Sequence, residues 1–177
     1  MNDNKFLNSK RLILKPFHRQ YITQKYVDWL NDKDIQKFTK KRPYQTIKLC
    51  IKFLDEQNLN NNIFFGVFLK NKEQEHIGNI LADTDYINSR SNLTILIGEK
   101  KYWGLGYGLE AWNLMLEYLL NDLKIRKVSA GTMSFNLGML KIMKLSGMED
   151  DGIRIKERMH NGKVYDEIYA AKFNEKQ

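Results

Sequence analysis

Three glycines at positions 104, 106 and 108 stand between an apolar run that ends at Ile97 and an amphipathic segment that follows. Glycine lets the backbone turn sharply and lets a ligand approach the main chain closely. Where a helix begins directly after such a turn, its free N–H groups and the positive end of its dipole form an anion site. The spacing therefore indicates a loop that binds phosphate groups, and a pyrophosphate is the natural ligand.

Two common pyrophosphate-binding loops do not match this segment. A nucleoside-triphosphate loop needs Lys-Ser or Lys-Thr after its glycines, and neither pair follows Gly108. A dinucleotide-binding loop needs G-x-G-x-x-G, but Leu109 stands where the third glycine belongs. The strand before the loop also belongs to a meander rather than to a βαβ unit. A tight turn with only a structural role is the remaining alternative to a different pyrophosphate ligand.

Periodicity indicates the elements that must position this loop. Strands are expected over residues 12–14, 63–69, 77–82, 93–97, 127–133, 152–159 and 164–173. Helices are expected over residues 20–31 and 32–38, from Thr46, over 108–122 and over 136–145. The dipeptide Asn161–Gly162 predicts a tight hairpin turn. The pattern predicts one α/β domain over residues 1–177, with three layers and a mixed, mostly antiparallel sheet of about seven strands between helices.

The balance of 29 Lys and Arg against 21 Asp and Glu gives a formal charge of +8. This excess favours an anionic partner such as nucleic acid, a nucleotide-linked metabolite or coenzyme A, and argues against a polyamine substrate. The basic residues are spread along the chain, however, which disfavours a dedicated nucleic-acid surface. We therefore expect no nucleic-acid partner.

Cysteine, histidine and hydropathy exclude further classes of site and location. Cys50 lies in an apolar helical context, where we expect a buried side chain rather than a nucleophile. His18, His76 and His160 have no neighbour at ligand spacing, so we expect no metal. No apolar run approaches the roughly 20 residues of a membrane helix, and the N-terminus lacks the apolar stretch of a signal peptide. These features predict a cytoplasmic protein with no membrane partner.

Five segments in order resemble the GCN5-related N-acetyltransferase (GNAT) superfamily, in its RimJ/RimL-like branch. The sequence K-Y-W-G-L-G at 101–106 is similar to the family motif Q/R-x-x-G-x-G/A, and Y-W-G-L-G-Y-G-L-E-A at 102–111 is similar to the branch's extended pattern. Four more segments match in order: R-L-I-L-K-P at 11–16, I-G-N-I at 77–80, S-F-N with K-L-S-G-M at 134–148, and N-G-K-V-Y-D at 161–166. The resemblance covers residues 9 to 172.

The resemblance implies acetyl-CoA as co-substrate and a sheet that splays apart at the cofactor site. The strands at 93–97 and 127–133 would separate to admit the pantetheine arm. The implied cofactor-binding residues are Ile95, Leu96, Ile97, Lys101, Tyr102, Trp103, Gly104, Leu105, Gly106, Tyr107, Gly108 and Asn136. Lys101 departs from the family's Gln or Arg, and Met143 stands where many relatives place a tyrosine general acid.

The implied reaction transfers an acetyl group to a primary amine, which must first lose a proton because alkyl amines are protonated at neutral pH. A carboxylate is the expected base. The predicted bases are Asp83, Asp85 and Glu99, with Asp166 and Glu167 as further candidates and Tyr86, His160 and Tyr165 as polar partners. Glu110 is expected to have a structural role at the helix start. Trp29, Phe38, Tyr44 and Tyr86 would line an acceptor pocket or belong to the core.

Three readings of the function follow from the resemblance. The first acceptor is a small-molecule amine such as a nucleotide-linked amino sugar, because residues 26–32 resemble a segment of relatives tied to surface-polysaccharide synthesis. The second is a protein N-terminus, as in ribosomal-protein acetyltransferases. The third reading is a non-catalytic domain that binds acyl-CoA or nucleic acid. The resemblance also allows a homodimer, for which the sequence shows no interface.

Overall fold

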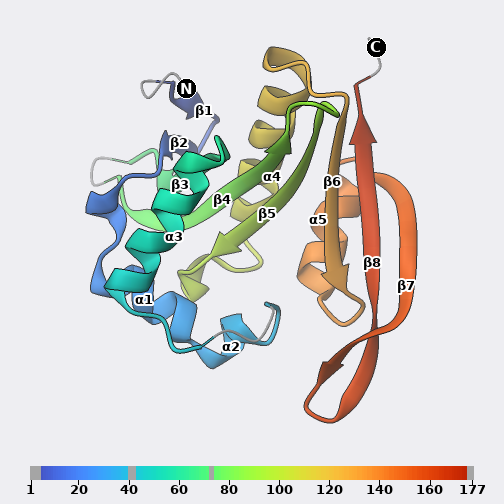
Figure 1. Cartoon of the computed structure of the whole chain (residues 1–177). Coiled ribbons are helices and arrows are strands. Elements are labelled where there is room, and N and C mark those ends of the chain that lie inside the picture. The colour runs from blue at the N-terminus through green and yellow to red at the C-terminus, as the bar shows by residue number, and fades with distance from the viewer. Residues whose placement is uncertain (1–4, 40–42, 72–73, 175–177) are drawn as a thin grey trace.

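The computed structural model describes residues 5–39, 43–71 and 74–174 and joins their strands into one sheet (Figure 1). The order is β1-β2-β3-β4-β5-β6-β8-β7, and every neighbouring pair is antiparallel except β5 and β6. The strands are β1 Leu7–Asn8, β2 Leu12–Pro16, β3 Ile63–Leu69, β4 His76–Asp85, β5 Arg90–Ile97, β6 Lys127–Met133, β7 Glu149–His160 and β8 Lys163–Phe173. The predicted mixed sheet is confirmed, with the two-residue β1 as an eighth strand.

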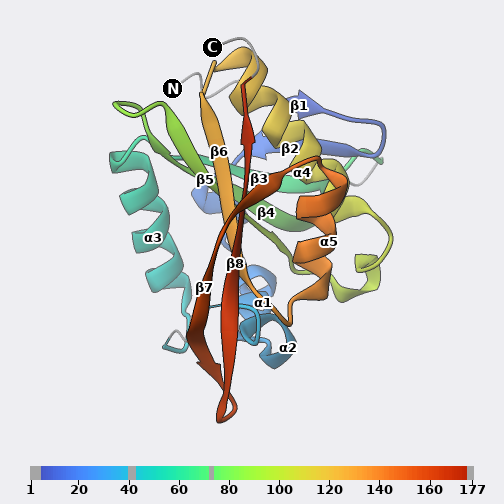
Figure 2. The same cartoon turned by 90° about the vertical axis from the view of Figure 1, so that its right-hand side faces the viewer.

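Helices cover both faces of this sheet, as predicted (Figure 2). They are α1 Gln24–Asn31, α2 Lys33–Gln36, α3 Ile47–Leu59, α4 Tyr107–Glu117 and α5 Leu137–Leu145. One core packs α4 and α5 against the sheet around the fully buried Trp112. The other packs α1 and α3 against the opposite face and includes Trp29 and the buried Cys50. No helix in the described ranges is long and apolar enough to cross a membrane.

Helix boundaries differ from the predicted ones by a few residues, for local reasons. The segment predicted as a helix over 20–31 begins with a 3-10 turn at Arg19–Tyr21, and α1 follows only after Thr23 caps it. Helix α4 begins one residue earlier than expected and continues past Glu117 as a π-helical turn to Asp122. Helix α3 begins at the predicted place because the Thr46 hydroxyl accepts a hydrogen bond from Leu49 N–H.

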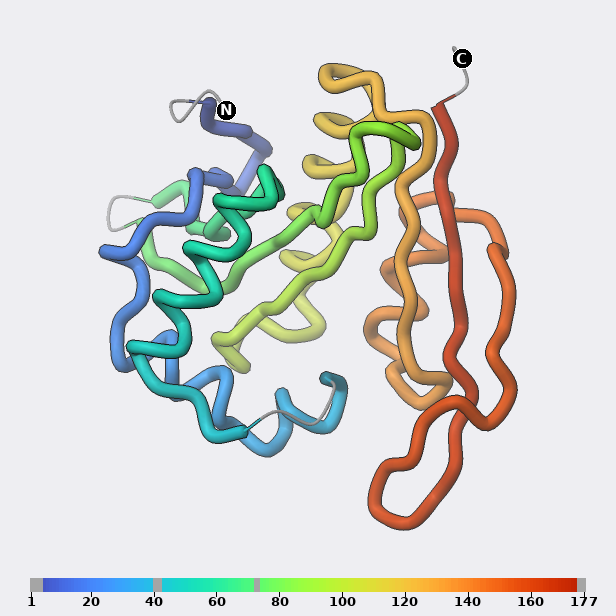
Figure 3. Tube along the Cα trace, viewed as in Figure 1, coloured from blue at the N-terminus to red at the C-terminus, as the bar shows by residue number. Residues whose placement is uncertain are grey.

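The parallel pair β5–β6 separates along its length. Register pairs join Arg90, Ser91 and Asn92 of β5 to residues 127–129 of β6 and then end. Beyond this point residues 93–97 remain paired only with β4, and residues 130–133 only with β8. We call these two diverging stretches the splay, and Figure 3 shows the two strands moving apart. The predicted separation of the two strands is confirmed.

The chain ends in the predicted hairpin of β7 and β8. Its turn residues Asn161 and Gly162 both have positive φ, 48° and 74°, as a tight two-residue turn requires. Strand β8 lies between β6 and β7, so it continues the sheet on the β6 side of the splay. Strand β7 is the edge of the sheet and is exposed along most of its length.

Candidate functional site

The glycine loop connects the end of β5 to the start of α4. After Ile97 the chain makes a 3-10 turn at Lys100–Tyr102, and the indole N–H of Trp103 donates a 2.7 Å hydrogen bond to the Ile97 carbonyl. Gly104 and Gly106 then take φ values of +74° and +83°, in the left-handed region that other residues adopt only with strain. This sequence of turns leads residues 104–106 directly into the first turn of α4.

The N-terminus of α4 differs from that of the other helices in the described part of the chain. Helices α1, α2, α3 and α5 are each capped by a side chain, from Thr23, Asp32, Thr46 and Asn136. Helix α4 has Gly106 at this position and no side-chain cap. The N–H groups of its first turn are therefore available to an external anion, and a pyrophosphate fits this arrangement.

Glu110 holds the first turn of α4 against the opening strand. Its carboxylate accepts hydrogen bonds from Ser9 Oγ at 2.7 Å, from Arg11 N at 2.8 Å and from Arg11 Nε at 2.6 Å. Arg11 Nη1 also donates to the Leu105 carbonyl, and the guanidinium lies 4.1 Å from the Tyr107 ring centroid. The expected structural role of Glu110 is confirmed.

Other residues predicted to bind the cofactor lie around the loop and the splay. Lys101 Nζ contacts Glu75 at 3.0 Å, and the Tyr102 hydroxyl donates to the same carboxylate at 2.7 Å. Asn136 caps α5 by accepting from Met139 N, and its Nδ2 donates to Thr132 Oγ1 at 3.0 Å. The stretch Ile95–Ile97 forms the β5 side of the splay. Binding of a cofactor by these residues stays a prediction.

Two of the predicted bases lie at the wrong end of their strands. Asp83 pairs with Asn92 and Asp85 with Arg90, at the end where β5 is still joined to β6. We expected their segment to open near the pantetheine arm, and this position is wrong because the splay opens at the other end of β5. Asp85 also accepts hydrogen bonds from Asn88 and contacts Arg90, which lowers its pKa from 3.8 to about 2. Such a carboxylate is a weak base.

Glu99 directly follows the β5 side of the splay, but it is engaged by two partners. Lys25 Nζ lies 2.8 Å from its carboxylate, and Trp29 Nε1 donates to it at 3.3 Å. Trp29 itself is buried in the core beneath α1 and lies against Gly98, where a Cβ would come within 2.0 Å of the indole. Glu99 thus anchors the end of β5 to α1.

Among the further candidates, Glu167 is the one the structure brings to the splay. It pairs in register with Met133 of β6 and is nine-tenths buried beside Arg158. Tyr169, two residues later on the same face, was missed by the sequence analysis. The period of two along β8 identifies it as a neighbour of Glu167, but only the register of β8 against β6 shows that both residues border the splay.

The other polar candidates lie elsewhere. Asp166 accepts a hydrogen bond from Lys156 N at 2.8 Å, and the Tyr86 hydroxyl donates to the Asn61 carbonyl at 3.1 Å. The rings of Tyr165 and His160 both pack against Phe135, with centroids 4.5 and 5.3 Å away. Phe38, which follows α2, joins this cluster, with its ring centroid 6.1 Å from that of Phe135. These residues form an aromatic cluster after β6.

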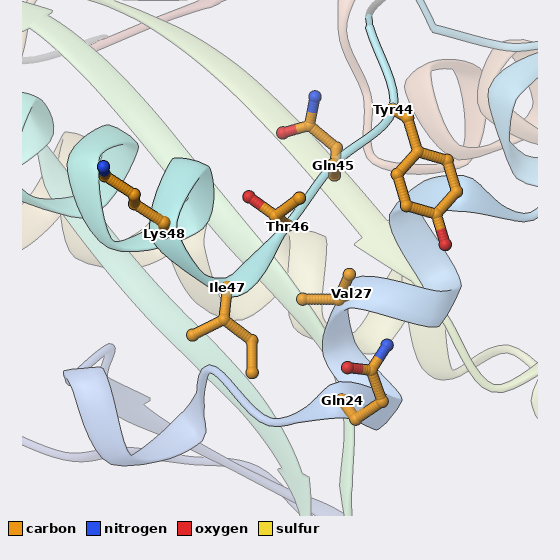
Figure 4. Close-up of a pocket in the computed structure, with 7 residues that line it drawn as sticks. All are labelled: Gln24, Val27, Tyr44, Gln45, Thr46, Ile47 and Lys48. Carbon is orange, nitrogen blue, oxygen red and sulfur yellow. The ribbon is translucent and has the colours of Figure 1, made fainter.

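Tyr44 lines a shallow hollow of about 340 Å³ rather than the splay (Figure 4). Its walls come from α1, from the segment before α3 and from the first turn of α3, and none comes from β5 or β6. The lining residues are Gln24, Val27, Tyr44, Gln45, Thr46, Ile47 and Lys48. This hollow is therefore separate from the site at the glycine loop.

Comparisons with known proteins agree with the geometry. A family model described as an acetyltransferase (GNAT) domain matches residues 11–149. The probable N-acetyltransferase YjcK of Bacillus subtilis (strain 168) is 29% identical over 106 residues, which are 53% of this chain and 59% of that protein. The match thus spans less than two thirds of that relative's length.

Two solved structures with coenzyme A share the fold. RimL, a ribosomal L7/L12 alpha-N-protein acetyltransferase in complex with coenzyme A, has a TM-score of 0.85 at 12% identity, over 98% of this chain and all of that one. Spermidine N-acetyltransferase from Vibrio cholerae, with CoA and spermine, has a TM-score of 0.83 at 18% identity, over 94% and 97%. The chain therefore belongs to the GNAT family of acetyltransferases.

Proposed function

We propose that this acetyltransferase transfers the acetyl group of acetyl-CoA to the primary amine of a small molecule that also carries negative charge, such as a nucleotide-linked amino sugar. The amine nitrogen attacks the thioester carbonyl carbon, a C–N bond forms and the C–S bond breaks. Holding the two reactants side by side supplies much of the rate, since the thioester is already activated. The acceptor is therefore selected by shape and charge around the splay.

The observation that carries this proposal is the pairing of carboxylates around the glycine loop and the splay. Glu99 is paired with Lys25 at 2.8 Å, Glu75 with Lys101 at 3.0 Å and Glu167 with Arg158 at 2.9 Å. Lys100 lies 2.7 Å from Asp32 and 2.8 Å from Asp34. A polycationic acceptor is recognised by carboxylates that are free to pair with it. These carboxylates are already neutralised, which disfavours a polyamine.

A basic stretch on β7 supplies positive charge that could attract an anionic acceptor. Arg154 lies 5.0 Å from the centroid of the Tyr169 ring, which itself borders the splay, and its side chain is well exposed. Lys156 follows on the same strand, whereas Arg158 is paired with Glu167. An arginine at this position can form a forked pair with a phosphate of the acceptor.

A protein N-terminus is the second candidate, and a specific feature favours it. Strand β7 is a twelve-residue edge strand with exposed Ile153, Ile155 and Met159. An extended peptide can pair with such an edge and bury apolar side chains. The net charge of +8 favours an acidic rather than a basic peptide.

The test measures thiol release from acetyl-CoA with matched acceptors: a nucleotide-linked amino sugar, the same sugar without phosphate, N-terminal peptides and polyamines. We expect the highest kcat/KM for the nucleotide-linked sugar. Arg154→Gln should raise KM for that acceptor more than for the free sugar. Arg19→Gln is the matched control, because Arg19 is an equally exposed arginine, ion-paired with Asp55 on the α1–α3 side. Preference for a polyamine or a peptide would overturn the proposal.

A further inference from the structure

One carboxylate, that of Glu75, holds the turn that leads into the glycine loop. Glu75 directly precedes β4, and its carbonyl accepts a 2.9 Å hydrogen bond from the Leu69 N–H of β3. Its backbone therefore continues the pairing of β3 with β4, which fixes the residue against the sheet. The side chain is 22% exposed. Glu75 thus has a defined position from which to hold a neighbouring segment.

Three donors from two other segments converge on this carboxylate. The Tyr102 hydroxyl donates to Oε2 at 2.7 Å, and Lys101 Nζ lies 3.0 and 3.3 Å from the two oxygens. Lys25 Nζ of α1 lies 3.4 Å from Oε1. Burial raises the pKa of Glu75, but these hydrogen bonds outweigh burial and leave the pKa below its ordinary value of 4.5. The carboxylate is therefore ionised at neutral pH, where it attracts both lysines.

Tyr102 carries this restraint on to the start of α4. Its ring lies edge-on to that of Tyr107, the first residue of the helix, with centroids 5.3 Å apart. The Tyr107 ring centroid lies 4.1 Å from the Arg11 guanidinium, which is itself bonded to Glu110. The glycine loop thus lies between two restraints. Glu75 holds the turn before it, and the pair of Arg11 and Glu110 holds the helix after it.

The departure of Lys101 from the Gln or Arg of the family motif has a counterpart in this arrangement. The Lys101 ammonium is paired with Glu75 at 3.0 Å. A lysine is a compact point charge that pairs readily with a carboxylate, whereas an anion at a helix start is bound by backbone N–H groups. The side chain at position 101 therefore helps to fix the turn, and the backbone that follows it is what a phosphate would contact.

We propose that Glu75 is a positioning residue for the acyl donor, because its hold on Tyr102 and Lys101 sets where the loop N–H groups lie relative to the end of β5. The inference rests on the proposed function in taking acetyl-CoA as the donor, but on no particular acceptor. The donor spans both features, since its pyrophosphate is expected on the loop and its pantetheine arm along Ile95–Ile97. A loop displaced from β5 could not hold both parts at once. Affinity for the donor therefore depends on Glu75.

The test measures acetyl-CoA binding by calorimetry for the wild-type chain, Glu75→Gln and Tyr102→Phe. We expect Glu75→Gln to bind about tenfold more weakly, since a displacement of about 1 Å can cost as much as about 10²-fold. Tyr102→Phe keeps the ring against Tyr107 and removes only the hydroxyl, so its loss should be smaller. In the double variant the two losses should not add, because both changes remove the same hydrogen bond.

Steady-state kinetics separate positioning from a merely structural role. In Glu75→Gln the KM for acetyl-CoA should rise while kcat stays near the wild-type value, because Glu75 lies beside the glycine loop rather than at the reacting carbonyl. A structural role alone would lower the free energy of unfolding in urea and leave this KM unchanged. Asp55→Asn is the matched control, because Asp55 on α3 is a carboxylate paired through both oxygens with Arg19 at 2.9 Å. Its KM for acetyl-CoA should equal that of the wild type.

The sign of the effect excludes a second role for the same contact. If Glu75 only withheld the Lys101 ammonium from the donor phosphates, Glu75→Gln would free this cation and bind acetyl-CoA more tightly. Tighter binding, or binding equal to that of the wild type, would overturn the inference. The double variant Glu75→Gln/Lys101→Met lacks the freed cation and should also bind weakly.

Tyr102→Phe keeps the test decisive where Glu75→Gln fails to fold, since wild-type affinity in Tyr102→Phe would equally overturn the inference. Failure of the proposed function has a different signature, because the wild-type chain itself would then not bind acetyl-CoA. Binding that the wild type shows and that Glu75→Gln leaves unaltered would sink this inference alone.

Discussion

The guanidinium of Arg11 and the carboxylate of Glu110 lie 2.6 Å apart, although 99 residues separate them in the chain. Arg11 also holds the Leu105 carbonyl, so it contacts both the glycine loop and the first turn of α4. The residue just before β2 thus braces the loop that we expect to bind the acyl donor. Stability and donor binding should therefore depend on the same pair.

Replacing Glu110 with alanine should lower the free energy of unfolding by about 2 kcal/mol, because it removes charged hydrogen bonds from a largely buried group. The same variant should bind acetyl-CoA more weakly. Denaturant unfolding and calorimetry measure the two effects, and Glu117→Ala, an exposed carboxylate on the same helix, is the control. Equal stability of the two variants would contradict the bracing role.

The difference in unfolding free energy between the wild type and Glu110→Ala should depend on pH. Burial by itself raises the pKa of Glu110, but hydrogen bonds from Ser9 and Arg11 outweigh it and leave the pKa lowered. The stabilisation by Glu110 is therefore complete above the pKa that this carboxyl has in the unfolded chain, and it is lost as the pH falls through the lower pKa that it has in the folded protein. The gap in stability between wild type and Glu110→Ala should narrow in acid.

Gly104 and Gly162 form a matched pair for testing the glycine loop. Both have φ of +74°, and in both a Cβ would meet no atom within 4 Å. Alanine at either position should cost about 1–2 kcal/mol of stability, because the left-handed conformation disfavours a Cβ. Only Gly104→Ala should also weaken acetyl-CoA binding in calorimetry. Equal binding by the two variants would place the pyrophosphate elsewhere.

Features written in short stretches of sequence were predictable here. The turn at Asn161–Gly162, the start of a helix at Thr46 and the glycine loop each depend on neighbouring residues, and the structure has all three at the expected places. The separation of β5 from β6 was predictable only through the family resemblance, since no local pattern marks it.

Features that depend on the register between distant strands were not predictable. Asp83 was expected near the open end of the splay, but the pairing of Asn92 with Ser129 fixes that end as the closed one. Tyr169 reaches the splay because β8 inserts between β6 and β7, an order that the sequence of a hairpin does not reveal. The residues near Asp83 and Tyr169 in the chain therefore did not reveal where these side chains lie relative to the splay.

Asp85 should prove to be a structural residue. Hydrogen bonds from Asn88 and the charge of Arg90 lower the pKa of Asp85 to about 2. Its stabilising effect is therefore complete above the ordinary aspartate pKa of 3.8 and is lost as the pH falls from there to about 2. Asp85→Asn should therefore keep the wild-type kcat/KM while unfolding at lower denaturant near neutral pH. A large loss of turnover at unchanged stability would restore Asp85 as a candidate base.

His76 should make the protein less stable in mild acid. Burial among aromatic rings, with Phe68 stacked at 4.7 Å and Trp29 at 5.1 Å, lowers its pKa from 6.5 to about 4. The unfolded chain binds this proton first, so stability is complete above about pH 6.5 and falls as the pH drops to about 4, by up to about 1.4 kcal/mol per pH unit. His76→Gln should flatten this part of the urea-unfolding profile, whereas His18→Gln, at an exposed position, should leave it unchanged. A profile that is already flat in the wild type would show that acid stability does not depend on this imidazole.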